Sequence, residues 1–423
     1  MRYKNLKTKV KRLKNDHYRT VRACRSCKSN KLVDILSLGD HYLSDFTKTN
    51  KEPKKYPLCL ILCETCNLLQ LKHTAPQSSL YTERYGYKSG INNTMKKELK
   101  EIVEKSLKKV KDQGFKALIA VDIGANDGTL LSYYPKHIVR VGVEPIRKFA
   151  KECEQHADFV INNFFNYRSY IQKVKNKKAH IITAISCFYD IDNPNQFVSD
   201  VKKILHKRGV FVVQQNYLVE MLRQNAFDNI LHEHLGYYSL KSLENLLNRH
   251  NLAVFDVEKS PINGGSFRTY ISHKNSRLVE ESVKRLREHE KSFKLNEIKI
   301  YKNFANRIKK NRNNLYKFIV NLVKKNKKVY IYGASTRGNT LLQFCNLDKS
   351  LISAAVERNS EKWGKKIASV AIPIISEEQA RLENPDYMLV LPWFFKEEFL
   401  KREQDYLKKG GHFIFPLPTL EII

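Results

Sequence analysis

The residues best suited to proton transfer lie in one stretch of the chain, residues 225–239. Within it His232, Glu233 and His234 stand side by side, and two tyrosines follow after Leu-Gly. Imidazole, carboxylate and phenol groups are the usual general acids and bases of enzymes. Because histidine titrates near neutral pH, we assign the role of base to His234 and expect Glu233 to orient it or to act as the base itself.

Four cysteines form a second group with a definite chemistry. Cys24 and Cys27 are separated by two residues, and so are Cys63 and Cys66. Each gap lets two thiolates face one ion, and two such pairs complete the tetrahedral sulfur set of a structural zinc site. Cys59 could compete as a ligand, although a buried structural thiol is its expected role. A redox dithiol is the weaker alternative, because there are two pairs and neither has the strand-helix context of redox motifs.

These side chains need a scaffold, and the segment from Lys116 supplies its first part. An apolar run reaches a turn that contains Gly124, Asn126, Asp127 and Gly128, and a helical pattern follows. Strand, glycine turn and helix in this order open a doubly wound α/β unit. The turn lacks the Gly-x-Gly-x-x-Gly dinucleotide fingerprint, which argues against a pyrophosphate on this helix.

Two further strands are predicted to end at the same edge of this sheet. Residues 137–143 run into Glu144, and residues 180–186 end at Ser186. A carboxylate at the position of Glu144 can accept hydrogen bonds from both hydroxyls of a ribose. The glycine turn, its acidic residues and Glu144 together resemble the S-adenosylmethionine site of class I methyltransferases. Ser186 is then expected beside the methyl donor.

The rest of the chain is predicted to complete this sheet and to form a second one. A helix is expected at 195–205, strands at 209–215, 252–257 and 266–272, and a basic helical connector at 276–328. The strand pair 252–257 and 266–272 forms a hairpin that closes the sheet. The residues between the two cysteine pairs, 36–56, are expected to loop out.

A second α/β unit begins at residue 328. Its strand runs into Gly333, and Ser335, Arg337 and Asn339 open the next helix, again without the dinucleotide fingerprint. Backbone amides after Gly333, together with Arg337, could hold a diphosphate. A purely structural lobe is the alternative.

Three tyrosines, Tyr81, Tyr85 and Tyr87, precede the first α/β unit. Such clusters pack or form interfaces more often than they catalyse. We nevertheless keep Tyr85 and Tyr87 as candidate hydrogen-bond donors, because they lie directly before the predicted donor-binding domain.

Composition sets the broad class of the protein. The chain has 423 residues, 42% of them hydrophobic, and a formal charge of +33. This size and hydrophobic content predict several packed domains. A basic excess can attract nucleic acid, anionic membranes or phosphorylated small molecules, but an A+T-rich coding bias gives the same lysine and asparagine content. Without an apolar run of membrane-spanning length, and with cysteines in metal-type pairs, we expect a cytoplasmic protein with no membrane partner.

From Cys24 to its end, the chain resembles the three-domain sugar C-methyltransferases, which act on nucleotide-linked keto-deoxysugars. The motifs that carry the resemblance follow one another in order: the cysteine pairs, Tyr85-Gly-Tyr-Lys-Ser, Gly124-Ala-Asn-Asp-Gly, Phe227-Asp-Asn-Ile-Leu-His-Glu-His, Asn263-Gly-Gly-Ser-Phe-Arg and Tyr332-Gly-Ala-Ser-Thr-Arg-Gly-Asn-Thr. One departure is Leu231, where members of the family carry a tyrosine. Methyl transfer to oxygen or nitrogen of a sugar therefore stays an alternative.

The resemblance implies a domain division and a role for each part. We divide the chain into a basic tail (1–22), a zinc-binding domain (23–75), a class I methyltransferase domain (76–275), a helical connector (276–328) and a Rossmann-like C-terminal domain (329–423). The middle domain would bind S-adenosylmethionine through Gly124, Asn126, Asp127, Gly128, Glu144 and Ser186. The nucleotide sugar would contact His232, Ser335, Arg337 and Asn339.

The implied reaction is methyl transfer to a carbon next to a ketone. His234 or Glu233 would remove the proton, and Tyr85 or Tyr87 would donate a hydrogen bond to the enolate oxygen. A nucleic-acid methyltransferase is a weaker alternative, because the basic excess lies mostly away from the His-Glu-His stretch. A scaffold that only binds partners is the non-enzymatic alternative, and the oligomeric state stays open.

Overall fold

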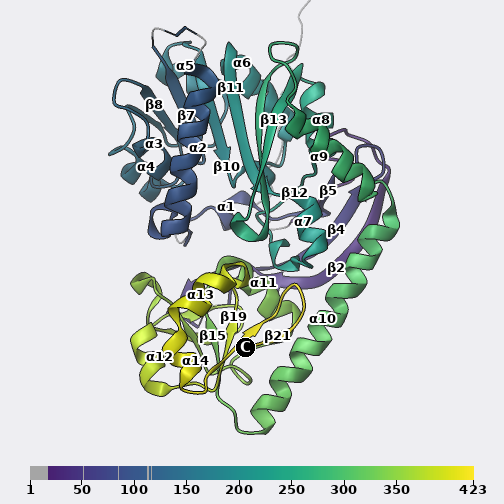
Figure 1. Ribbon diagram of the computed structural model, residues 1–423, viewed down its shortest axis with the longest axis vertical. Helices are drawn as coiled ribbons and strands as arrows, with labels where there is room; N and C mark the ends of the chain where they lie inside the picture. Colours follow the sequence, from purple (N-terminus) through teal and green to yellow (C-terminus); the bar gives the residue numbers. More distant parts are fainter. Residues whose placement is uncertain (1–17, 51, 84, 112–113, 116) are drawn as a thin grey trace, which may run out of the picture.

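The computed structural model describes residues 18–50, 52–83, 85–111, 114–115 and 117–423. Most of the predicted basic tail, up to residue 17, therefore lies outside the described residues. The described chain forms three parts, each built on its own sheet, and one long helix leads from the middle part to the last (Figure 1). The predicted multidomain α/β class is confirmed.

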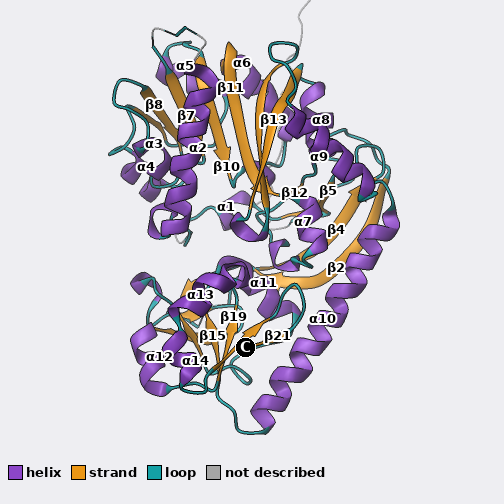
Figure 2. Ribbon diagram, viewed as in Figure 1, coloured by secondary structure: helices purple, strands orange, loops and turns teal. Residues whose placement is uncertain are grey.

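The N-terminal part is built on a four-stranded antiparallel sheet in the order β12-β5-β4-β2 (Figure 2). Its strands are β2 (Leu32–Tyr42), β4 (Lys55–Cys63), β5 (Leu69–Leu71) and β12 (Gly236–Tyr237), while β1 (Arg19–Thr20) pairs separately with β6 (His73–Thr74). The predicted loop at 36–56 was wrong at both of its ends. Leu36, Leu38, Leu58 and Leu60 are buried on a long hairpin of β2 and β4, and this burial extends both strands.

The middle part holds a seven-stranded sheet in the order β13-β14-β11-β10-β7-β8-β9. The parallel strands are β7 (Ile119–Ile123), β8 (Val139–Val143), β9 (Phe159–Ile161), β10 (Ala179–Ile185) and β11 (Leu205–Asn216), and the predicted hairpin is β13 (Leu252–Ser260) with β14 (Ser266–His273). A parallel sheet that ends in an antiparallel pair is the arrangement expected for a class I methyltransferase. The parallel strands end at the edge of the sheet that faces the C-terminal part (Figure 1).

Helices cover both faces of this sheet. The helices of the middle part are α1 (Gln77–Leu80), α2 (Asn93–Lys111), α3 (Thr129–Ser132), α4 (Arg147–Cys153), α5 (Tyr167–Val174), α6 (Pro194–Ile204), α7 (Leu218–Arg223) and α8 (Leu240–Asn248). On α2, Leu99, Ile102, Val103 and Val110 recur at helical spacing and are buried, so one face of the helix packs on the sheet.

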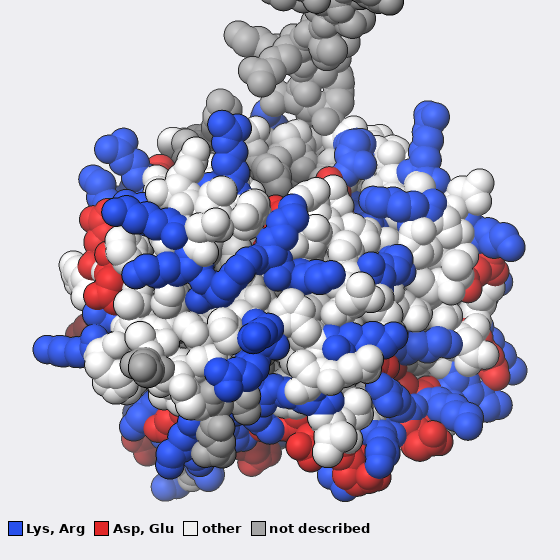
Figure 3. Space-filling model, turned by 90° about the horizontal axis from the view of Figure 1, so that it is seen from above, with Lys and Arg blue, Asp and Glu red and all other residues white. Residues whose placement is uncertain are grey.

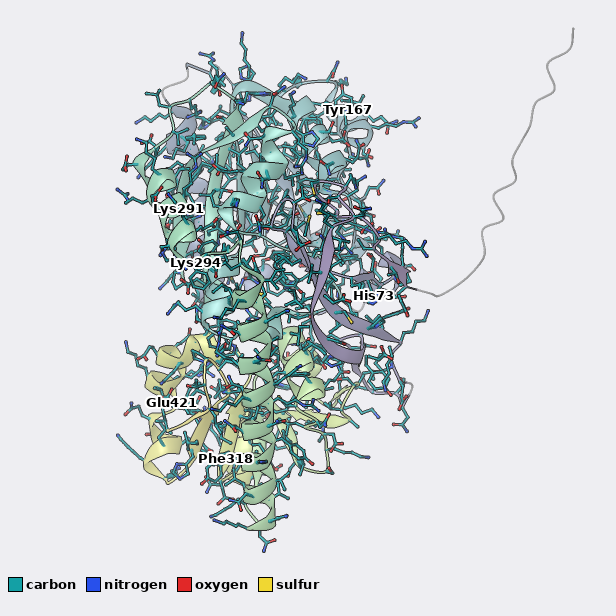
Figure 4. All side chains as sticks on the ribbon, turned by 90° about the vertical axis from the view of Figure 1, so that its right-hand side faces the viewer. His73, Tyr167, Lys291, Lys294, Phe318 and Glu421 are labelled. Carbon is teal, nitrogen blue, oxygen red and sulfur yellow. The ribbon has the colours of Figure 1, made fainter. Side chains whose placement is uncertain are left out.

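The predicted helical connector consists of α9 (Glu281–Ser292) and α10 (Ile298–Lys324). α10 runs along the molecule to the far end of the C-terminal part (Figure 4). There Phe318, which Figure 4 labels, packs edge-to-face on Tyr387 with ring centroids 6.3 Å apart. α10 is long but basic, and among the described residues no helix is both long and apolar enough to cross a membrane.

The C-terminal part is an eight-stranded sheet in the order β21-β20-β19-β15-β16-β18-β17-β3. Its strands are β15 (Val329–Tyr332), β16 (Ala354–Val356), β17 (Lys366–Ile367), β18 (Ile372–Ile375), β19 (Tyr387–Val390), β20 (His412–Phe415), β21 (Glu421–Ile422) and β3 (Phe46–Thr47). Its helices are α11 (Thr336–Phe344), α12 (Glu377–Glu383), α13 (Lys396–Arg402) and α14 (Gln404–Lys408). Its last strand, β3, comes from the N-terminal part, so one short strand of that part extends the C-terminal sheet.

The stretch 225–239 lies where all three parts meet. Gly236 and Tyr237 form β12 and pair with β5 of the N-terminal sheet. The carbonyl of Ile230 accepts a hydrogen bond at 2.9 Å from the hydroxyl of Thr340 on α11. The His-Glu-His residues between these two contacts are thus held from both sides.

Candidate active site

A cavity of about 460 Å³ lies at the carboxyl edge of the middle sheet. Its lining includes Gly124 and Asn126 after β7, Glu144 after β8 and Ser186 after β10. Parallel strands bring their carboxyl ends to one edge, so these residues share a wall although they are far apart in sequence. Four of the six residues assigned to the donor from sequence are therefore brought together here.

Glu144 is held in place by the backbone of the cavity wall. Its Oε2 accepts a hydrogen bond from the N–H of Asn126 at 2.9 Å, and its Oε1 accepts one from the N–H of Ile146 at 2.8 Å. Burial raises the pKa of this carboxyl group. Each carboxylate oxygen can accept a second hydrogen bond, so the group can also receive two hydroxyls of a ligand.

Asn126 and Asp127 attach the tyrosine segment to the glycine turn. The side-chain amide of Asn126 donates to the carbonyl of Tyr87 at 3.2 Å and accepts from the N–H of Ser89 at 2.9 Å. Asp127 Oδ2 accepts a hydrogen bond from the N–H of Gly90 at 2.8 Å. These contacts hold the tyrosines over the cavity.

The glycines of this turn adopt backbone conformations that other residues avoid. Gly124 has φ 74° and Gly128 has φ 80°. A Cβ atom at Gly128 would also lie 3.0 Å from the Cα atom of Cys153, so this glycine lets the turn approach α4. Asp127 and Gly128 shape the turn, and neither is among the described residues that line the cavity.

The cavity is acidic although the protein is strongly basic. Its carboxylate residues are Asp122, Glu144, Asp190, Asp192 and Asp200. No Lys, Arg or His is among the described lining residues, whereas Lys and Arg cover much of the face seen from above in Figure 3. Because S-adenosylmethionine carries a sulfonium and an ammonium group, this lining fits it better than it fits an anion.

Glu233 lies within electrostatic reach of this cavity. Its side chain is buried, and burial raises the pKa of its carboxyl group to about 7. Burial raises the pKa of Tyr81, Tyr85 and Asp190, all of which line the cavity, and the charge of Glu233 raises it further. A carboxyl group with this pKa can accept a proton at neutral pH.

The protonation behaviour of His234 differs from the one expected from the sequence. Its Nδ1 lies 2.9 Å from the carbonyl oxygen of Asn229, a distance that fits an Nδ1–H donor and leaves Nε2 as an acceptor. Burial and the charge of Arg337 lower the pKa of His234 to about 3, so the ring stays neutral at physiological pH. The lowered pKa contradicts the expectation that His234 titrates near neutrality. Whether His234 or Glu233 acts as the base stays a prediction.

His232 is turned toward the N-terminal part. Its Nε2 lies 3.0 Å from the carbonyl oxygen of Tyr56 on β4, and burial lowers its pKa to about 4. It is not among the described residues that line the cavity. The contact anchors the His-Glu-His segment, and a role of His232 in substrate binding stays a prediction.

All three tyrosines selected from sequence line the cavity. Burial raises the pKa of Tyr85 well above its ordinary value, so its hydroxyl keeps its proton and can donate a hydrogen bond. Tyr87 is 44% exposed, which makes it the less protected of the two candidate donors.

Asp190 is a cavity residue that sequence reasoning did not single out. It ends a short 3₁₀-helix (Phe188–Asp190) that follows β10. Its Oδ1 atom is buried and has no hydrogen-bond partner among the described residues. Burial, and next the charge of Glu233, raise the pKa of Asp190 well above its ordinary value. Its position just beyond a predicted strand end was the only signal in the sequence.

Arg337 joins the C-terminal part to the middle part. Its guanidinium lies 2.7 Å from Asp228 Oδ2 and donates to the carbonyl of Asn263 at 2.7 Å. Asp228 is buried and also accepts a hydrogen bond from Trp393 at 3.1 Å. The side chain predicted to hold a diphosphate is thus paired with a carboxylate of the protein.

Ser335 and Asn339 also have partners within the protein. The hydroxyl of Ser335 caps α11 by accepting a hydrogen bond from the N–H of Gly338 at 3.0 Å. The amide of Asn339 donates to Ser44 and accepts from Ser369, both at 2.7 Å. Contacts of these residues with a nucleotide sugar stay predictions.

The four cysteines predicted to bind zinc form one cluster. The Sγ atoms of Cys24, Cys27, Cys63 and Cys66 all lie within 4.8 Å of one another. The Sγ atoms of Cys24 and Cys66 are 3.6 Å apart, and those of Cys27 and Cys63 are 3.5 Å apart. In a tetrahedral site with Zn–S bonds of about 2.3 Å, the sulfur atoms are roughly 3.8 Å apart. Cys59 is outside the cluster, and its Sγ contacts Ser37 on the partly exposed side of the hairpin.

We expect Glu144→Ala to bind S-adenosylmethionine at least about tenfold more weakly, because each charge-assisted hydrogen bond contributes roughly 1.5 to 3 kcal/mol. Isothermal titration calorimetry measures the change. Glu144→Gln should show an intermediate loss, since it keeps the shape of the side chain and one acceptor oxygen. Glu154→Ala, an exposed carboxylate beyond α4, is the matched control. Unchanged affinity in Glu144→Ala would exclude Glu144 from the donor site.

Three family models match the chain one after another. They are described as "Putative zinc binding domain" over residues 24–81, "Methyltransferase domain" over residues 91–257 and "C-methyltransferase C-terminal domain" over residues 261–418. The chain is also 29% identical to the C-methyltransferase NovU of Streptomyces niveus, over 96% of this chain and 98% of that protein.

Solved methyltransferase structures resemble the chain over less than half of its length. The plantazolicin methyltransferase BamL, in complex with a substrate analogue and SAH, is 13% identical, with a TM-score of 0.34 over 42% of this chain and 85% of that one. An S-adenosylmethionine-dependent methyltransferase of Clostridium acetobutylicum is 15% identical, with a TM-score of 0.33 over 42% of this chain and 92% of that one. The sheet order, the acidic cavity, the cysteine cluster and the three matched models agree that the chain is an S-adenosylmethionine-dependent methyltransferase with an N-terminal zinc-binding domain, similar over nearly its whole length to a C-methyltransferase.

Proposed function

We propose that the protein transfers a methyl group to a carbon next to the ketone of a nucleotide-linked keto-deoxysugar. The observation that supports this most is the position of Glu233, a buried carboxyl group with a pKa near 7 within electrostatic reach of the donor cavity. Carbon becomes nucleophilic only after a proton is removed, so carbon methylation requires a base beside the methyl donor. S-adenosylmethionine supplies the electrophilic methyl group.

In this proposal Glu233 is the base. Its carboxylate takes the proton from the carbon next to the ketone, and the electron pair of the broken C–H bond forms the enolate. That pair then makes the new carbon–carbon bond, the ketone is restored and the proton leaves from Glu233. Tyr85 donates a hydrogen bond to the enolate oxygen, and His234 accepts one at Nε2 from a hydroxyl of the sugar.

We place the nucleotide at the carboxyl edge of the C-terminal sheet. Gly333, with φ 86°, directly follows β15, and the N–H of Ala334 donates to Oε2 of Glu357 at 3.1 Å, just beyond β16. The donor site contains an equivalent contact: the N–H of Asn126 donates to Oε2 of Glu144 at 2.9 Å. The absence of a cation from the described lining of the donor cavity also favours a diphosphate position outside it.

The test is to incubate the protein with S-adenosylmethionine and a panel of nucleotide-linked keto-deoxysugars, each paired with the matching alcohol that lacks the ketone. S-adenosylhomocysteine should be released only with ketones, and NMR of the product should show the new methyl group on carbon. Methylation of an alcohol partner would indicate O-transfer instead. Methylation of RNA or DNA that declines steeply with salt would indicate a nucleic-acid substrate.

A further inference from the structure

Between the two cysteines of the first zinc-binding pair lies an arginine whose side chain is buried. Arg25 follows Cys24 directly, and its side chain is 3% exposed. Its guanidinium donates hydrogen bonds to the carbonyl of Leu71 and, at 2.7 Å, to the hydroxyl of Thr74. Because burying a cation is costly unless it is paired and hydrogen-bonded, we expect the charge and the donors of Arg25 to have a specific use.

The same guanidinium also contacts the wall of the donor cavity. Its Nε donates a hydrogen bond to Oδ1 of Asp192 at 3.3 Å. Asp192 lies just beyond the 3₁₀-helix that follows β10, and it is one of the residues that line the cavity. The side chain of Arg25 therefore joins the zinc-binding turn, to which its backbone belongs, to a cavity of the middle part.

A second arginine of the N-terminal part contacts the same carboxylate. Arg19, on β1, donates to Oδ1 and Oδ2 of Asp192 at 2.6 and 2.5 Å. The side chain of Arg19 is 59% exposed, however, whereas that of Arg25 is almost fully buried. Exposed ion pairs contribute little because water and salt screen them, so the buried arginine is the one that can fix the position of Asp192.

Further contacts hold the zinc-binding turn on the segment that carries Asp192. The side-chain amide of Asn195, in the first turn of α6, donates to the carbonyl of Arg25 at 3.0 Å and to that of Ser26 at 2.6 Å. Arg249, just beyond α8, donates to the hydroxyl of Ser26 at 2.6 Å. Because zinc binding is coupled to the folding of such a turn, the metal and these contacts together keep Arg25 in place relative to Asp192.

We propose that Arg25 is a positioning residue that couples the zinc-binding turn to the donor cavity by fixing Asp192 in the cavity wall. The N-terminal part then contributes to the binding of S-adenosylmethionine as well as to its own fold. Without the guanidinium, Asp192 keeps only the exposed pair with Arg19. The proposal concerns the donor, so it is independent of the acceptor that is methylated.

Donor binding tests the proposal, and isothermal titration calorimetry with S-adenosylmethionine and with S-adenosylhomocysteine measures it. Arg25→Gln should bind both compounds roughly tenfold more weakly, the effect of losing one hydrogen bond to a charged group, and should retain one zinc ion per chain. Arg19→Gln is the matched control, because it removes the exposed guanidinium from the same carboxylate, and it should change the affinities by about threefold or less. Unchanged affinities in Arg25→Gln would overturn the proposal.

The two compounds separate a positioning role from an electrostatic one. S-adenosylmethionine has a sulfonium charge that S-adenosylhomocysteine lacks. If Arg25 acted only by placing positive charge near the cavity, Arg25→Gln would bind S-adenosylmethionine more tightly and S-adenosylhomocysteine as before. That result would also overturn the proposal, since a loss of position weakens the binding of both compounds.

A double-mutant cycle tests whether Arg25 acts through Asp192. The double variant Arg25→Gln/Asp192→Asn should bind the donor about as weakly as the weaker single variant, because both changes break one contact. Fully additive losses would show that the two residues act independently and would contradict the proposal. If Arg25→Gln loses zinc or its fold, Arg25→Lys takes its place in every comparison. Its single ammonium group keeps the charge but cannot reproduce the fork that contacts Leu71, Thr74 and Asp192 together.

Discussion

Glu233→Gln is expected to lower turnover by roughly 10² to 10⁴ while leaving S-adenosylmethionine binding unchanged. The variant keeps the size of the side chain but has no lone pair basic enough to take a proton from carbon. With S-adenosylhomocysteine in place of the donor, wild type should exchange deuterium from heavy water into the carbon next to the ketone. Glu233→Gln should do so far more slowly, and proton NMR of the substrate follows the exchange.

His234→Gln is the matched comparison, because it alters the adjacent side chain of the same segment. If the neutral ring only accepts a hydrogen bond, this variant should retain most of the exchange activity and lose mainly substrate affinity. The opposite result, exchange lost in His234→Gln and kept in Glu233→Gln, would assign the base to His234.

The pH dependence follows from the same group. Because Glu233 must be ionised to act, turnover should rise with pH through about 7, and this acidic limb should disappear in Glu233→Gln. The free energy of unfolding should decrease over the same pH range. Between the ordinary pKa of 4.5 and about 7, the unfolded chain ionises Glu233 while the folded protein holds its proton, so stability falls as pH rises.

Above pH 7 this loss is complete and amounts to roughly 3 kcal/mol, at about 1.36 kcal/mol for each unit of pKa. Glu233→Gln lacks the cost, so it should be more stable than wild type at pH 8 and nearly equal at pH 4. Urea unfolding at the two pH values measures the difference. Equal stability of the two proteins at pH 8 would contradict the raised pKa of Glu233.

Cys27→Ser is expected to release zinc and unfold the N-terminal part. Structural zinc contributes on the order of 10 kcal/mol to the folding of small zinc modules. The effect should reach the active site, because Cys63 ends β4 and Cys66 precedes β5, and β5 pairs with Gly236 two residues after His234. Metal analysis, circular dichroism and methyl transfer should therefore all report a loss.

Cys59→Ser is the control, since Cys59 lies on the same strand as Cys63 but outside the sulfur cluster. It should retain one zinc ion per chain and full secondary structure. Freshly purified wild-type protein without zinc would contradict the assignment of the four cysteines.

The sequence alone determined the fold class, the cysteine cluster and most of the donor site. These features depend on local patterns. A two-residue gap places two thiolates on one turn, and a strand that runs into Gly124 must turn where a glycine conformation is needed. Because parallel strands end at a common edge, the ends of the two neighbouring strands place Glu144 and Ser186 beside that turn.

Only the tertiary structure decided which side chains can carry out the chemistry. The pKa of Glu233 depends on burial, and that of His234 on burial and on the charge of Arg337, which lies about a hundred residues away in sequence. Asp190 was missed because an unpartnered oxygen can be recognised only when all of its neighbours are known. The engagement of Arg337 by Asp228 likewise arises between two domains, where spacing along the chain carries no information about contact. Burial and electrostatic environment are properties of the packed structure, so no local sequence pattern could have assigned acid and base within this site.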